Sequence, residues 1–128
     1  MIEEALRARL LAVAGVTALV STRVYPVVMP QDPTFPCVTY QRLGEVRHLR
    51  MGAPAPLNDV VFQVDAWAEG FQACKTLAAA IRTALDAVSW TAGAETVQVA
   101  YLQTEEDGYE DAIPCFRVTQ RYRVAANA

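Results

Sequence analysis

Three cysteines and one histidine are the residues of this chain best suited to nucleophilic or metal chemistry. Cys37, Cys74 and Cys115 are widely spaced, no Cys-x-x-Cys pair occurs, and His48 is the only histidine. A zinc site requires grouped Cys, His or carboxylate ligands, and a cysteine nucleophile requires a base beside it. Because the spacing favours neither, we expect no metal and no cofactor. We interpret the cysteines as small apolar side chains of a reducing compartment.

An acidic run is the second candidate for chemistry. Residues 105–111 read Glu-Glu-Asp-Gly-Tyr-Glu-Asp and place five carboxylates close together. They lack the ligand spacing of an EF-hand loop, and a contiguous run does not predict two separated catalytic carboxylates. We interpret the run as a solvated acidic loop, or as a surface that faces a partner.

Basic residues form two further features. One group leads into the predicted long connection or lies on it, and consists of Arg42, Arg47, His48 and Arg50. The other is a stripe on one face of the last predicted strand, made of Arg117, Arg121 and Arg123. Cross-strand pairing with neighbours such as Asp65, together with solvation, would account for the stripe.

The alternative is that the basic and acidic surfaces meet between copies of the chain. A head-to-tail contact of this kind closes into a ring where its rotation allows. The candidate contact residues are Arg42, Arg47, Arg50, Asp107, Glu110, Asp111, Arg117, Arg121 and Arg123.

Composition and missing motifs argue against an enzyme and against a protein that grips nucleic acid. The chain has no glycine-rich phosphate loop, nucleophile elbow, zinc-protease helix or dinucleotide fingerprint. A net charge of −3 is unlike the basic surface that neutralises phosphates. The apolar run from Leu10 to Val20 is too short to span a bilayer. We therefore predict a non-enzymatic protein without a membrane partner, synthesised in the cytoplasm.

The helices and strands that we expect from the sequence form one α+β domain over residues 1–128. Its 53% hydrophobic residues supply a core of the size expected for a chain of this length. Apolar periodicity predicts the order α-β-β-α-β-β, a four-stranded antiparallel or mixed sheet with helices on one face, and a long hairpin arm. The predicted helices are Ile2–Val13 and Phe71–Ala87, the strands are Cys37–Leu43, Val60–Trp67, Thr96–Thr104 and Cys115–Val124, and the arm is Gly44–Asp59.

The predicted side-chain pattern is specific enough to be tested. Phe71 and Ile81 are expected in the core, as the positions most costly to truncate. Val97, Val99 and Tyr101 are expected on one face of their strand, and residues 90–94 in a loop.

Four segments in this order resemble the small tail-completion proteins of long-tailed bacteriophages, also called tail terminators or head–tail joining proteins. They are residues 18–26 (ALVSTRVYP), 35–42 (FPCVTYQR), 62–68 (FQVDAWA) and, after the acidic run, 116–124 (FRVTQRYRV). Related copies occur in prophages and in gene transfer agents. The chain departs from the family pattern in the acidic run itself, which ends in Ile113 and Pro114.

The resemblance implies a structural virion protein at the junction of neck and tail. Such a protein forms a ring, typically a hexamer, that caps the tail tube, halts its polymerisation and leaves a channel for DNA. The implied partners are further copies of the chain, the major tail-tube protein and a head–tail connector or stopper protein, while DNA passes without specific binding. The alternative from another class is a small dimeric ligand-binding or regulatory α+β domain with a pocket between helix and sheet.

Overall fold

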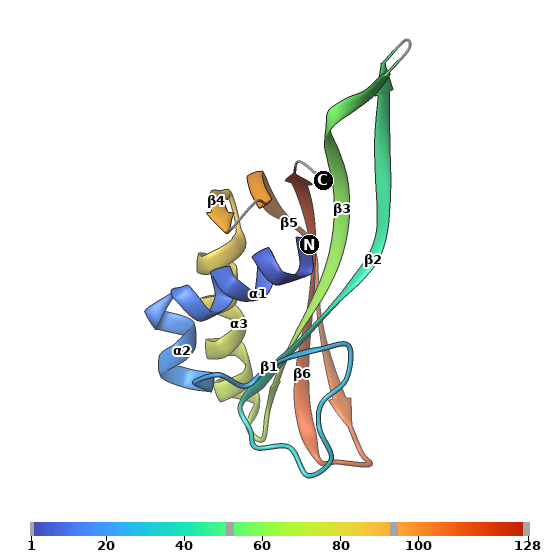
Figure 1. Ribbon diagram of the computed structural model, residues 1–128. Coiled ribbons are helices and arrows are strands. Elements are labelled where there is room, and N and C mark those ends of the chain that lie inside the picture. The colour runs from blue at the N-terminus through green and yellow to red at the C-terminus, as the bar shows by residue number, and fades with distance from the viewer. Residues whose placement is uncertain (1, 51–52, 93–94, 127–128) are drawn as a thin grey trace.

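Three helices cover one face of a six-stranded sheet in the computed structural model (Figure 1). The structure describes residues 2–50, 53–92 and 95–126, and of residues 46–50, 53–58 and 95 it describes the backbone alone. The elements are α1 (Ile2–Ala12), α2 (Ala14–Val20), β1 (Val24–Pro26), β2 (Cys37–Arg50), β3 (Ala53–Ala68), α3 (Phe71–Leu85), β4 (Val88–Ala92), β5 (Glu95–Glu110) and β6 (Cys115–Ala126).

The sheet contains two more strands than the four predicted. Its order is β1-β2-β3-β6-β5-β4, with β1 parallel to β2 and every other neighbouring pair antiparallel. The additional strands, β1 and β4, are short and lie at the two edges, where a single ladder holds each of them. Residues 90–92 therefore belong to a strand, and the predicted loop at residues 90–94 is wrong over its described part. The α+β class and the placement of the helices on one face are as predicted.

The centre of the sheet is the ladder between β3 and β6, which runs from Asn58 opposite Ala126 to Ala68 opposite Phe116. Alternate residues of both strands point at the helices, as the sequence predicts. Phe62, Val64, Val118, Tyr122 and Val124 are all at most 1% exposed on this face.

Helix α3 packs its apolar stripe onto these central strands. Residues at spacings of three and four are buried, among them Leu77, Ile81 and Leu85. Phe71 departs from the prediction, because its side chain is 49% exposed. It is the first residue of α3 and follows directly after the end of β3, so the sheet covers only part of its ring.

Two bulges in β5 change which residues face the helices. Val97 pairs with Ala126 and Val99 with Ala125, so one extra residue intervenes. Val97 and Ala100 are consequently buried, whereas Val99 and Tyr101 are 40% and 41% exposed, and the predicted common face is wrong. The acidic run is also not a loop, since β5 continues through it to Glu110 in register with β6.

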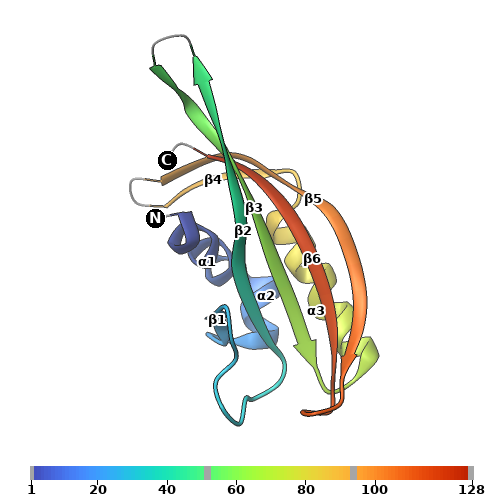
Figure 2. The same ribbon diagram turned by 90° about the vertical axis from the view of Figure 1, so that its right-hand side faces the viewer.

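The predicted hairpin arm is present as a two-stranded ribbon (Figure 2). The ladder with β6 ends at Asn58, but β2 and β3 continue to pair beyond it up to Arg50 opposite Ala53. We call the ribbon of residues 44–58 the arm. It projects from one end of the sheet, and the β5–β6 turn and the start of α3 lie at the other end (Figures 1 and 2).

Truncating the two predicted core residues of α3 will have unequal effects on stability. Ile81→Ala will lower the free energy of unfolding by about 2–5 kcal/mol, because the side chain is fully buried. Phe71→Ala will cost about 1 kcal/mol, because half of the ring already contacts water in the folded state. Urea denaturation followed by circular dichroism measures both values, and equal losses would contradict this account.

Candidate assembly surface

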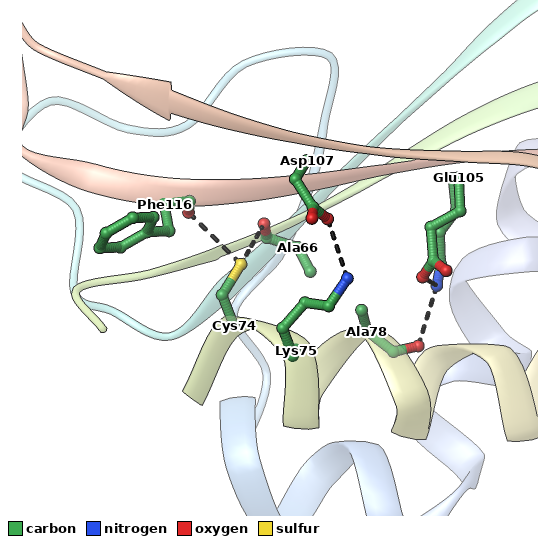
Figure 3. A network of polar contacts seen from close by, with 8 residues as sticks. Ala66, Cys74, Lys75, Ala78, Glu105, Asp107 and Phe116 are labelled. Atoms are coloured by element: carbon green, nitrogen blue, oxygen red, sulfur yellow. Dashed lines mark hydrogen bonds and ion pairs between the residues drawn. The ribbon is translucent and has the colours of Figure 1, made fainter. Parts of the chain in front are cut away.

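A polar strip joins α3 to the acidic end of β5 (Figure 3). Lys75 Nζ lies 2.9 Å from Asp107 Oδ1, in an exposed ion pair. Further along, Gln120 is buried on the helix-facing side and donates from Nε2 to the Ala78 carbonyl and to Glu105 Oε1, both at 3.0 Å. Both carboxylates face α3 because the second bulge of β5, between Leu102 and Thr104, sets their register. The acidic run is therefore partly used within its own chain.

Gln120 is a site residue that the sequence interpretation missed. Its Oε1 accepts a hydrogen bond from the Tyr122 hydroxyl at 2.7 Å, so the oxygen and the nitrogen of the side-chain amide both have partners. The alternation of β6 was a sufficient signal, because residue 120 falls on the same face as Val118 and Tyr122. A satisfied buried amide fixes the position of α3 over β6 more precisely than an apolar contact.

Arg117 makes the second internal ion pair of the acidic run. Its Nη1 lies 2.6 Å from Glu110 Oε1, and its guanidinium lies 5.7 Å from the centre of the Trp67 ring. Gly108 is the cross-strand neighbour of Arg117, and a Cβ there would lie 2.6 Å from Nη2, the flexible end of that side chain.

Asp65 is not the partner of the arginine stripe. It is 6% exposed and accepts hydrogen bonds from the Thr119 hydroxyl at 2.6 Å and from Gln63 Nε2 at 3.0 Å. The arginine that pairs across strands in this region is Arg123, with Asp59. The stripe therefore does pair across strands, but through Arg123 with Asp59 and not through Asp65.

The other predicted contact residues divide by their surroundings. Arg42 makes long ion pairs with Glu3 at 3.8 Å and Glu45 at 3.7 Å. Arg121 and Asp111 are exposed and have no ion-pair partner among the described residues. The side chains of Arg47, His48 and Arg50 lie outside the described residues, although the backbone of all three belongs to the arm.

An exposed group of aromatic rings lies at the end of the sheet opposite the arm, and the sequence interpretation did not identify it. The Phe116 ring contacts Phe71 at a centroid distance of 5.7 Å and Tyr109 at 5.0 Å, both edge to face. Phe71 and Tyr109 are 49% and 50% exposed. We call Phe71, Tyr109 and Phe116 the aromatic cluster. Only the pairing of β5 with β6 brings Tyr109 beside Phe116.

The three cysteines are buried and free. Burial raises the pKa of the Cys37 thiol to about 12 and that of Cys74 to about 11. The Cys74 thiol donates to the Ala66 carbonyl at 3.2 Å (Figure 3). A nucleophilic cysteine requires a lowered pKa and an accessible sulfur, so these thiols have the opposite properties.

Metal and membrane functions receive no support from the described part of the chain. Within residues 2–50, 53–92 and 95–126, His, Cys, Asp and Glu side chains form no group of three that could hold a metal ion. Over the same residues, no helix has the length and apolar character needed to cross a bilayer.

Comparison with known proteins identifies the class. The family model described as "Tail completion protein gp17" matches residues 4–126, so the chain belongs to this family of structural phage tail proteins. Among solved structures, a chain of the virion of a native gene transfer agent (GTA) particle has the same fold. It superposes with a TM-score of 0.76 at 21% identity, over 96% of this chain and 92% of that chain. No curated protein matches by sequence.

Raising the pH will destabilise the protein through its buried thiols. Each thiol keeps its proton in the folded state but ionises from about pH 8.5 in the unfolded state. The stability that each buried thiol contributes is therefore complete below that pH and is lost as the pH rises toward the raised folded pKa. We expect Cys37 and Cys74 each to lower the free energy of unfolding by about 2 kcal/mol between pH 8 and pH 10. Urea denaturation at both pH values measures this change. A slope that stays the same in Cys37→Ala and Cys74→Ala would refute the assignment.

Proposed function

We propose that this protein forms a ring that terminates the tail tube and joins the tail to the head connector, with a central channel for DNA. The family match over residues 4–126 carries the proposal. The fold likeness to a chain of a gene transfer agent virion supports a place within a virion, which we assign to the junction of neck and tail. The proposed partners are further copies, the major tail-tube protein and a connector or stopper protein. Six copies per ring is the number that the family resemblance implies.

Two unlike ends of the molecule support a head-to-tail ring. The arm extends from one end, and the acidic β5–β6 end lies opposite (Figure 1). A contact between two different surfaces is heterologous, and it closes into a ring or continues as a filament. We infer that residues 1–128 act as one domain in each copy. We also infer that the ring is closed, because a tube terminator must end growth rather than continue it.

Passage of DNA requires a channel wall that does not hold phosphates. The chain carries a net charge of −3, and four of its described arginines, Arg42, Arg82, Arg117 and Arg123, already pair with carboxylates. Proteins that grip DNA instead present unpaired cations to many phosphates. The charge balance therefore supports transit without specific binding.

The charged contact residues remain part of the proposal, and we rank them by the ion pairs that described side chains make within the chain. We propose that Arg121 and Asp111, which have no such pair, contribute most among the charged contacts between copies, and we add Arg47 and Arg50 for their place on the arm. Residues that already pair inside the chain would have to exchange one partner for another and so gain less. This second group comprises Arg42, Asp107, Glu110, Arg117 and Arg123.

One observation favours the alternative of a small dimeric ligand-binding or regulatory domain. An open cleft of about 560 Å³ lies between the start of α1 and the β1–β2 edge of the sheet. It is lined by Glu3, Glu4, Pro26, Val27, Tyr40, Gln41 and Arg42. Its volume would admit a small molecule.

Purified protein will form rings that stop tube growth. Negative-stain imaging and light scattering across a concentration series will show a closed particle of about six chains. Adding this protein to polymerising tail-tube protein will shorten the tubes and leave one ring at a tube end. A compact monomer or dimer at every concentration, without tube binding, would contradict the proposal and favour the ligand-binding alternative.

Charge on the arm will matter more than equal charge elsewhere. Arg50→Glu will raise the concentration needed for half-maximal ring assembly by about tenfold, which corresponds to the loss of about 1.4 kcal/mol per contact. Arg82→Glu changes the net charge equally on the exposed side of α3, where it removes the pair of Arg82 with Asp86, and will leave assembly unchanged. Light scattering measures both variants, and circular dichroism melts confirm that they remain folded. Equal effects of the two variants would show that only net charge matters.

A further inference from the structure

The aromatic cluster presents more apolar surface than a solvated strand end requires. Phe71 and Tyr109 expose about half of their side chains, and both are held by edge contacts with Phe116. These contacts orient the rings before any partner arrives, so little side-chain freedom remains to be lost on binding. Exposed aromatic residues held in this way are typical of interface anchors.

The surroundings of the cluster indicate what kind of partner fits. A hollow of about 310 Å³ adjoins the Phe71 ring and is lined by Phe71, Gln72 and Lys75. Residues 105–111, which include Tyr109, contain five carboxylates. Asp107 and Glu110 are paired with Lys75 and Arg117, and Glu105 accepts a hydrogen bond from Gln120. This end of the molecule therefore combines exposed rings with an excess of negative charge. A complementary partner is apolar and basic.

The arm has this composition. It contains Arg47 and Arg50 against a single carboxylate, Glu45 at its base, and its apolar residues include Leu49, Pro54 and Leu57. Beyond the end of the β6 ladder, the ribbon has only its own two strands to pair with. Contact with a covering surface would add packing to this part of the ribbon, which no third strand supports. The arm and the aromatic cluster therefore suit each other in composition.

We propose that the aromatic cluster is the docking surface for the arm of a second copy of this chain. The apolar residues of the arm cover Phe71 and Tyr109, and Arg47 and Arg50 lie among the carboxylates of residues 105–111. Arm and cluster lie at opposite ends of the molecule, so one chain does not satisfy its own cluster (Figures 1 and 2). Each copy gives one arm and receives one. This inference rests on the proposed ring and names the surfaces that close it.

A matched pair of tyrosine substitutions tests the docking surface. Tyr109 and Tyr101 lie on the same strand with similar exposures of 50% and 41%, but only Tyr109 belongs to the cluster. Tyr109→Gln will raise the half-assembly concentration at least tenfold, and Tyr101→Gln will change it less than twofold. Light scattering gives these concentrations, and thermal melts check that both variants fold. Equal responses of the two variants would overturn the proposal.

Disulfide trapping tests the contact directly. The native cysteines are buried, so an added surface cysteine is the thiol accessible for disulfide formation. Arg50→Cys protein mixed with differently tagged Gln72→Cys protein will form a mixed disulfide under mild oxidation, and neither variant alone will form one. Thr83→Cys, exposed near the other end of α3, replaces Gln72→Cys as the control and will not be trapped.

The outcomes separate this inference from the proposed function. If wild-type rings form but Tyr109→Gln leaves them intact and no mixed disulfide appears, the docking surface is wrong and the ring function stands. If the wild-type protein forms no ring and caps no tube, the proposed function fails, and this inference fails with it. A disulfide between two chains of Arg50→Cys protein alone would contradict the proposed docking surface. It would indicate a symmetric contact between two arms instead.

Discussion

The rest of the structure depends on the register between β3 and β6. This ladder joins two hairpins, β2–β3 and β5–β6, that have no other direct strand pairing with each other. It places Phe62, Val64, Val118 and Tyr122 on one surface, on which α3 packs. A slip of one residue would turn all of these side chains to the opposite face, so burial under the helices specifies the register strongly.

That central ladder leaves both ends of the molecule available for contacts. At one end β2 and β3 outrun β6 and continue as the arm. At the other end β5 and β6 carry their acidic and aromatic residues to the rim where α3 begins. The chain belongs to a family of structural tail proteins, and distinct surfaces of this kind suit contacts with other proteins. The chain accordingly has a rigid centre and chemically different ends.

Much of the surface charge is satisfied within the chain. Lys75 of α3 pairs with Asp107, and Arg117 of β6 pairs with Glu110. Two different elements thus supply cations to the same acidic run. Exposed pairs of this kind add little stability, but they hold side chains in place and lower the local charge. Beside these paired charges, the rings of Phe71 and Tyr109 remain half-exposed. This contrast is why we assign the contact energy between copies to the rings and its direction to the charges.

Local periodicity was sufficient to predict the two main helices and the alternating faces of β3 and β6, because each depends on residues close in sequence. The length of the connection between two predicted strands indicated the arm. The sequence also determined the family, through the order of its segments. Tertiary structure decided the edge strands β1 and β4, the bulges of β5 and the exposure of Phe71, because each depends on where another strand ends. It likewise decided that Tyr109, Phe116 and Phe71 meet. Such a cluster is made by pairing between segments far apart in the chain, which no local pattern encodes.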